Sequence, residues 1–177
     1  EFERAMAKYV GVRHAVAVNS GTSALQLIVR SLGIGPGAEV ITTPFSFIAS
    51  ANCIVVEGAK PVFVDIDAAT YNLDVARVEA AITPRTKAIL GVDIFGRCVD
   101  WKGLRAIADR HGLALIEDSC EAIGAESNGR RAGSFGDAGC FGFYPNKQMT
   151  TGEGGIIVTD REDLAATCRC LRNQGRE

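Results

Sequence analysis

The sequence is poor in the residues that build metal sites and disulfide frameworks. Its 177 residues include only 2 histidines, and the 6 cysteines are scattered along the chain without a C-x-x-C pair. Zinc sites and disulfide frameworks both need tighter spacing of these residues. We therefore expect no metal site, and we interpret the cysteines as small buried hydrophobic residues in a reducing compartment.

A strong charge of one sign and long apolar runs are also missing. The formal net charge is −2, without the clustered lysines and arginines that a nucleic-acid-binding surface needs. No run approaches the ~20 apolar residues that span a bilayer, and no signal peptide is visible. We expect a cytoplasmic protein that binds neither nucleic acid nor membrane. Hydrophobic residues, at 47%, suffice for a substantial core.

Apolar strands alternate with amphipathic helices through most of the chain. The expected helices cover residues 1–9, 22–32, 48–57, 74–81 and 101–111, and the expected strands cover 14–18, 39–42, 61–65, 88–92, 113–117 and 156–158. The strand at 61–65 has a continuous apolar core, as expected where helices cover both faces of a sheet. The pattern predicts an α/β fold with a mostly parallel central sheet and helices on both faces.

Both ends of the sequence lie within this pattern. The chain opens without methionine in a helical pattern, and it stops just after another helix. We expect residues 1–177 to be a piece of a longer protein.

Two polar segments follow apolar strands, at the strand ends where ligands bind in open α/β sheets. The turn at 20–23 begins a helix, whose free N–H groups and dipole favour a phosphate, and Thr22 and Ser23 add hydroxyl donors. Asp118 follows the apolar strand at 113–117 and can pair with a cationic ring nitrogen, as in pyridoxal phosphate. An ordinary helix cap is the alternative for each segment.

A third segment contains Lys147, one of five lysines in the chain. It lies between a short aromatic strand and a Thr/Gly-rich turn, and the apolar strand at 156–158 follows. A lysine fixed by strands on both sides can serve as an amine nucleophile that forms Schiff bases with carbonyls and with pyridoxal phosphate. The alternative is a solvated loop lysine. The phosphate-binding turn, the carboxylate and the lysine together supply the three anchors of a pyridoxal phosphate site. Phe47 can complete this site by stacking on the ring, and the alternative is that Phe47 is a core residue.

Four segments carry a resemblance to a known family: residues 20–25, 43–49, 117–124 and 143–155. They resemble the DegT/DnrJ/EryC1/StrS family of pyridoxal-phosphate-dependent sugar aminotransferases, and the resemblance covers essentially the whole chain. It implies fold type I, with residues 1–177 as the large cofactor-binding domain and a smaller C-terminal domain absent from this sequence. It also implies a homodimer for the full-length protein.

The resemblance also implies roles for single residues. Lys147 would be the catalytic lysine that holds the cofactor as a Schiff base and shuttles the proton, and Asp118 would face the pyridine nitrogen. The remaining cofactor-binding positions are Gly21, Thr22 and Ser23 at the phosphate, Phe47 on the ring and Glu121 near the phenolic oxygen. Glu121 replaces the Gln or His of many members, as in the perosamine-synthase-like branch, and Gly142 replaces a serine that helps to hold the phosphate.

The reaction implied moves an amino group from an amino acid, with glutamate as the expected donor, to a nucleotide-linked keto-sugar. Amino-sugar, lipopolysaccharide or antibiotic biosynthesis would use it. The alternatives are a sugar 3-dehydratase of the same family, a cyclitol or aminohydroxybenzoate aminotransferase, and a regulatory relative without turnover. Lys147 disfavours the dehydratase, since those enzymes carry histidine in its place.

Overall fold

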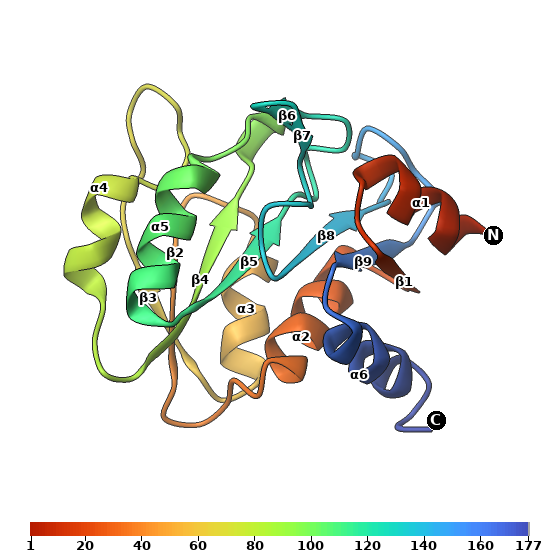
Figure 1. Ribbon diagram of the computed structural model, residues 1–177, viewed down its shortest axis with the longest axis horizontal. Helices are drawn as coiled ribbons and strands as arrows, with labels where there is room; N and C mark the ends of the chain where they lie inside the picture. The colour runs from red at the N-terminus through yellow and green to blue at the C-terminus, as the bar shows by residue number, and fades with distance from the viewer. Residues whose placement is uncertain (177) are drawn as a thin grey trace.

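The computed structural model describes residues 1–176, which form a seven-stranded sheet covered by helices (Figure 1). The strands of the sheet are β1 (His14–Val18), β2 (Glu39–Thr42), β3 (Lys60–Phe63), β4 (Thr86–Val92), β5 (Ala114–Asp118), β8 (Ala138–Gly142) and β9 (Gly155–Thr159). Their order is β1-β9-β8-β5-β4-β2-β3. Among these strands only β9 runs opposite to the others, which confirms the prediction of a mostly parallel sheet.

Helices cover both faces of the sheet, as predicted. The α-helices are α1 (Phe2–Val10), α2 (Gly21–Ser31), α3 (Ala49–Val56), α4 (Val75–Val78), α5 (Trp101–His111) and α6 (Glu162–Arg172), and β6 (Glu126–Ser127) and β7 (Arg130–Arg131) form a separate hairpin. One core contains side chains of α2, α3 and α6, and the two cores on the other face contain those of α4 with α5 and of α1.

The continuous apolar sequence of the central strands follows from this double cover. In β4, Ala88 and Leu90 belong to the core beneath α2 and α3, whereas Ile89 between them belongs to the core beneath α5. In β2, Val40 and Ile41 divide in the same way. Each strand residue is therefore buried on one face or the other, and none of these five is accessible to solvent.

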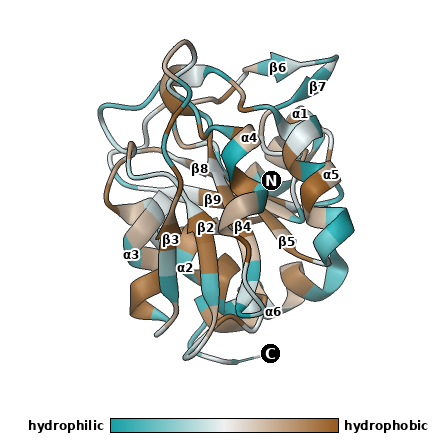
Figure 2. Cartoon of the chain, turned by 90° about the vertical axis from the view of Figure 1, so that its left-hand side faces the viewer, coloured by the Kyte–Doolittle hydropathy of each residue, from teal (hydrophilic) through white to brown (hydrophobic). Residues whose placement is uncertain are grey.

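The outer strand β3 differs from the prediction. The sequence at 61–65 predicts a strand covered on both faces, but β3 pairs only with β2 and lies at the edge of the sheet (Figure 2). Phe63 is 52% exposed, and Lys60 is exposed as well. Pro61 is compatible with such an edge, because proline has no N–H to donate to a neighbouring strand.

Two other elements are shorter than predicted. The helix expected at 74–81 is the single turn of α4 followed by a 3₁₀ turn at Glu79–Ala81, a common way for a helix to tighten at its end. The aromatic strand expected just before Lys147 ends at Gly142, so that residues 143–154 form a loop. Within residues 1–176 no helix combines the length and the hydrophobicity that a membrane crossing requires.

Candidate active site

The sheet has one hollow at each end of its parallel strands. A hollow of about 320 Å³ lies at the carboxyl ends, where Asp118, Lys147 and the start of α2 contribute to its wall. A hollow of about 880 Å³ lies at the opposite ends, among the segments that lead into β2, β4, β5 and β8. Ligands of open α/β sheets bind outside the carboxyl ends of the strands, so we assign the chemistry to the smaller hollow.

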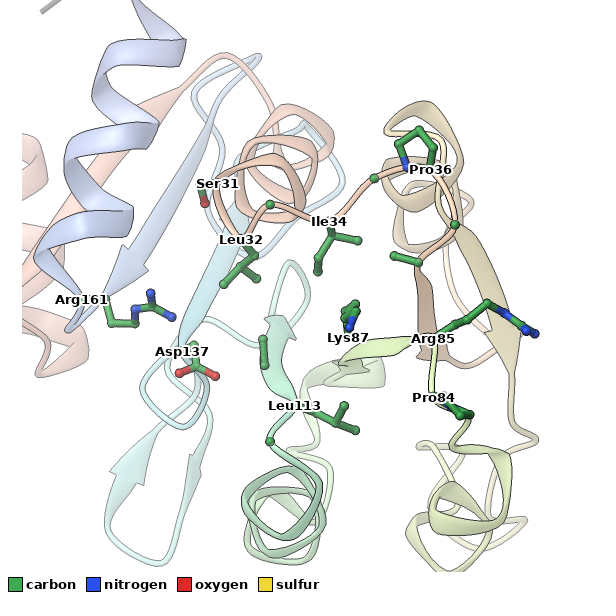
Figure 3. A pocket seen from close by; sticks show the side chains of 16 residues that line it. Ser31, Leu32, Ile34, Pro36, Pro84, Arg85, Lys87, Leu113, Asp137 and Arg161 are labelled. Atoms are coloured by element: carbon green, nitrogen blue, oxygen red, sulfur yellow. The ribbon is translucent and has the colours of Figure 1, made fainter.

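Of the four charged side chains that line the larger hollow, Arg85, Asp137 and Arg161 have partners, whereas Lys87 forms no ion pair within the described residues. Arg85 lies 2.7 Å from the carboxylate of Glu39, and Arg161 pairs with Asp163. Figure 3 shows Arg85 pointing away from the middle of this hollow. The carboxylate of Asp137 accepts the N–H of Leu115 at 2.7 Å. Arg85, Asp137 and Arg161 therefore stabilise the segments around them.

Lys147 lies in the loop between β8 and β9. The two ends of this loop are tied together, since the N–H of Phe143 donates to the carbonyl of Gly154 at 2.8 Å. The Lys147 side chain is only 15% exposed, and its Nζ lies 3.2 Å from Oε1 of Glu121. The amine is therefore held inside the hollow by a single carboxylate, although the strand predicted on its near side is a loop.

Asp118 is the last residue of β5 and is 6% exposed. Its Oδ2 accepts a 2.6 Å hydrogen bond from Oγ of Ser50 in α3, and Ser50 in turn is 2.8 Å from Oγ of Ser46. Within residues 1–176 no basic side chain forms an ion pair with Asp118. A nearly buried carboxylate that is oriented by a hydroxyl and lacks a cation is suited to receive a cationic N–H from a ligand.

Two further carboxylates lie behind Asp118 and were not predicted as functional residues. Asp93 is fully buried and accepts hydrogen bonds from Trp101 Nε1 at 2.9 Å and from Ser119 Oγ at 2.8 Å. Burial raises the pKa of Asp93 to about 6 against the effect of these donors. Glu117 faces the other side of the sheet, where burial, with the charge of Asp93, raises its pKa to about 8. A charged residue inside an apolar strand is the signal that marks Glu117.

The start of α2 forms the second wall of the hollow. Oγ of Ser20 caps this helix by accepting the N–H of Ser23 at 3.1 Å, and it also lies 3.0 Å from the Ser23 hydroxyl. Among the described residues, the N–H groups of Gly21 and Thr22 have no hydrogen-bond acceptor. A Cβ at Gly21 would lie 2.7 Å from Sγ of Cys120, so a side chain there would fill the cradle. Two free N–H groups at a helix start form an anion site.

The other predicted residues lie around this cradle. Glu121 lines the hollow and accepts the N–H of Phe95 through Oε2 at 3.1 Å, while its Oε1 faces Lys147. Phe47 lines the rim and is 69% exposed. Gly142 lies at the floor of the hollow, and Thr22 lies in its wall. Ser23 is not among the lining residues, because its hydroxyl turns toward Ser20.

Sequence reasoning missed Ser50 and Cys120. Ser50 orients Asp118, and Cys120 lies between the cradle and the floor. The pair Ser46 and Ser50, four residues apart in an otherwise apolar segment, is the signal that could have revealed the first. A cysteine among apolar residues gives no such signal.

These groups fit the shape and charge of pyridoxal phosphate. The free N–H groups at α2 suit its phosphate, the cation-free carboxylate of Asp118 suits its pyridine nitrogen, and the amine of Lys147 suits its aldehyde carbon. The profile of the DegT/DnrJ/EryC1/StrS aminotransferase family matches residues 1–177. The chain belongs to this family.

Individual relatives agree with this membership. The chain is 52% identical over 177 residues to the GDP-perosamine synthase of Caulobacter vibrioides, and the match covers 100% of this chain and 48% of that protein. The crystal structure of DesV from S. venezuelae, described as a complex with a ketimine intermediate, is 47% identical with a TM-score of 0.97, covering 99% of this chain and 48% of that chain.

A third relative is described with its cofactor. The structure of NtdA from Bacillus subtilis with bound cofactor PMP is 39% identical with a TM-score of 0.88, covering 94% of this chain and 38% of that chain. The predicted fold, the large domain of a fold type I aminotransferase, is therefore confirmed. The chain spans about half the length of the curated relatives it matches.

Proposed function

We propose that the whole protein is a pyridoxal-phosphate-dependent aminotransferase that moves an amino group from an amino acid to a nucleotide-linked keto-sugar. One observation carries this proposal: Lys147 and Asp118 line the same hollow, at the carboxyl ends of the parallel strands, beside the start of α2. An amine, a carboxylate and a helix start are the groups that this cofactor requires. The family membership supports the proposal, and the name of the perosamine synthase favours a nucleotide-linked sugar.

The residues of the hollow divide the work of holding the cofactor. Gly21 and Thr22 offer N–H groups to the phosphate, and Ser23 completes the turn that presents them. Asp118 would hold the ring nitrogen in its protonated form, and Ser50 fixes the orientation of the Asp118 carboxylate. When bound, pyridoxal phosphate supplies an aldehyde carbon that takes up amino groups and a protonated ring that withdraws electrons.

Lys147 is the proposed group for proton transfer, and Glu121 positions its amine. With the cofactor bound, Nζ of Lys147 would take the proton from Cα of the amino acid in one half of the reaction and give a proton to the sugar carbon that receives the amino group in the other, so that one amine serves both directions of transfer. Glu121, 3.2 Å away, holds the amine in place between these steps. Phe47 covers the ring from the rim, where its exposed face can contact both the cofactor and the sugar. Glutamate is the proposed amino donor.

Exposed apolar side chains near the rim support the proposal of a homodimer. The ring of Phe45 lies 5.8 Å from Tyr71 and 6.1 Å from Phe95, and Phe47 follows it in the chain. Figure 2 looks onto the β3 edge, beside which α3 leaves Val55 and others exposed. Monomeric proteins rarely leave so many large apolar side chains exposed together. A second copy that covers this surface would also close the hollow.

Two further parts of the proposal concern the whole protein. We place it in the cytoplasm, where thiols stay reduced, and in the biosynthesis of amino sugars, of lipopolysaccharide or of antibiotics. We also assign residues 1–177 to its large, cofactor-binding domain, to be joined in the full-length protein by a smaller C-terminal domain.

A substrate screen of the full-length protein tests the function. The protein is incubated with pyridoxal phosphate, glutamate and a panel of nucleotide-linked keto-sugars, and the product is identified by its mass. We expect an amino sugar together with a Schiff-base absorbance band. A band without any product from sugars would favour a cyclitol or other ring ketone as substrate. The absence of both would contradict the proposal and favour a regulatory relative.

A further inference from the structure

Three potential metal ligands meet at the floor of the smaller hollow. Cys140 lies in β8, paired in register with Asp118 of β5, and Cys120 follows Asp118 by two residues. One carboxylate oxygen of Asp118 and the two sulfur atoms all lie within 4.8 Å of one another. The sequence gives no hint of this cluster, because the two cysteines are 20 residues apart and only the pairing of β5 with β8 joins them.

The spacing of the two sulfur atoms is that of a tetrahedral metal site. Sγ of Cys120 lies 3.7 Å from Sγ of Cys140. Two thiolates bound at the usual zinc–sulfur distance of ~2.3 Å, at a tetrahedral angle, are about 3.8 Å apart. A disulfide, by contrast, would need the two sulfur atoms to approach to about 2.0 Å. The observed Sγ–Sγ distance of 3.7 Å therefore suits two thiolates bound to one metal ion better than a disulfide.

The three ligands differ in exposure, so that an ion can reach the site from the hollow. Cys140 and Asp118 are buried, whereas Cys120 is partly exposed and lines the hollow. An ion can reach Cys120 from the hollow and complete its coordination with the two groups behind it. Thiolate sulfur selects soft or borderline ions such as Zn²⁺ and Cd²⁺ over Mg²⁺ and Ca²⁺.

We propose that Cys120, Cys140 and Asp118 form a zinc-type metal site that is filled when the cofactor is absent. Each thiol releases its proton to solvent as its Sγ–metal bond forms, the carboxylate supplies the third ligand and water the fourth, and no electron is transferred. The ion occupies Asp118, the residue that the cofactor needs. Metal and pyridoxal phosphate therefore exclude each other; this second part, unlike the metal site itself, rests on the proposed function.

Cadmium binding to the cofactor-free, reduced full-length protein tests the site. Cd²⁺ is added while the thiolate-to-metal charge-transfer absorbance is recorded, and bound metal is counted after desalting. We expect one ion per chain with the absorbance of two thiolates, reversed by a chelator. A missing band in the reduced wild-type protein would overturn the proposal. So would the loss of two free thiols without bound metal, since that result identifies a disulfide.

Matched variants locate the ion. Cys120→Ser and Cys140→Ser should each lose the band and at least the roughly 10–100-fold in affinity that even an outer-shell change costs at metal sites. The controls are Cys170→Ser, partly exposed like Cys120, and Cys168→Ser, buried like Cys140. Both controls should bind as the wild type does. Thermal melts identify any variant that fails to fold, and chelator reversal in the wild-type protein does not depend on the variants. A full band in both hollow variants would overturn the assignment.

A competition experiment separates the site from its consequence. Loading the protein with pyridoxal phosphate first should suppress the cadmium band, and adding cadmium first should slow the appearance of the Schiff-base absorbance. Simultaneous binding of both would overturn the exclusion alone. A cadmium band in a protein that never takes up pyridoxal phosphate would confirm the metal site while contradicting the proposed function.

Discussion

The two hollows at opposite ends of the same strands differ in what their charges can do. In the larger hollow Arg85 and Arg161 are paired with carboxylates from neighbouring segments. In the smaller hollow Asp118 has a hydroxyl partner but, within the described chain, no cation, and Lys147 has one carboxylate partner on the rim. Strand direction and the cation-free carboxylate of Asp118 therefore locate the candidate chemistry, whereas volume alone would select the opposite end of the sheet.

The largest effect should come from the lysines of the two hollows. Lys147→Ala removes the amine at the carboxyl ends, and we expect turnover to fall by roughly 10³-fold or more, since acid–base catalysis alone contributes about 10²–10⁴-fold. The Schiff-base absorbance should disappear. Lys87→Ala, the matched change in the larger hollow, should leave both unchanged. Full activity of the Lys147 variant would contradict the assignment, and an equal loss in both variants would remove the distinction between the hollows.

The aspartates of the two hollows provide a second matched pair. Asp118→Asn keeps an acceptor for Ser50 but removes the negative charge, so we expect turnover to fall by about 10²-fold and the cofactor to dissociate more readily. Asp137→Asn keeps an oxygen for the N–H of Leu115 and should not alter turnover. Steady-state kinetics and cofactor titration measure both. Wild-type cofactor affinity and turnover in the Asp118 variant would show that its charge is not used.

Strand-end reasoning reached the main members of the site from sequence alone. Asp118 ends one apolar strand and the turn at 20–23 follows another, and parallel strands bring such ends to one edge of a sheet. The edge position of β3 was not predictable in this way, because a short apolar strand has the same composition at an edge and at the centre. Lys147 lines the smaller hollow, but the strand predicted beside it is a loop, because aromatic residues favour strands and loop cores alike.

Side-chain partners across elements were beyond sequence reasoning. The contact of Ser50 with Asp118 spans 68 positions, and that of Cys120 with Cys140 spans 20. Each depends on which strand lies beside which, and strand order is not encoded in local periodicity. The resemblance to a family supplied roles for residues but did not reveal these contacts.

Two buried glutamates, Glu117 and Glu39, should make the stability of the protein depend on pH in opposite ways. Burial raises the pKa of Glu117 to about 8, so the folded protein binds its proton more tightly than the unfolded chain does. The stability that this group contributes is complete below the unfolded pKa near 4.5 and is lost as the pH rises through about 8. We expect a loss on the order of 1 kcal/mol per pH unit in that window, measured by urea unfolding. Glu117→Gln should flatten this slope.

Glu39, which pairs with Arg85 near the larger hollow, provides the opposite case. Hydrogen bonds from Thr83 and Arg85 lower its pKa, so its contribution to stability is present above the unfolded pKa and is lost as the pH falls through the folded value. Glu39→Gln should therefore change the acid side of the stability profile and leave the alkaline side intact. If one of these variants changed the pH dependence of the unfolding free energy on both the acid and the alkaline side, the two glutamates would not act in separate pH ranges.

The smallest effect should come from the aromatic rim, and it tests whether the smaller hollow extends beyond its charged floor. Phe47→Leu keeps an apolar side chain but removes the ring, and the ~0.5–1.5 kcal/mol of an aromatic stack corresponds to a cofactor affinity weakened by about 2- to 13-fold. Phe63→Leu, an exposed aromatic of β3 outside both hollows, controls for the general loss of exposed rings. Titration with pyridoxal phosphate measures both variants. Equal affinities in the two variants would limit the binding site to Lys147, Asp118 and the start of α2. A loss confined to Phe47→Leu would instead include the rim, because only a stacked ring makes cofactor affinity depend on aromaticity at an exposed position.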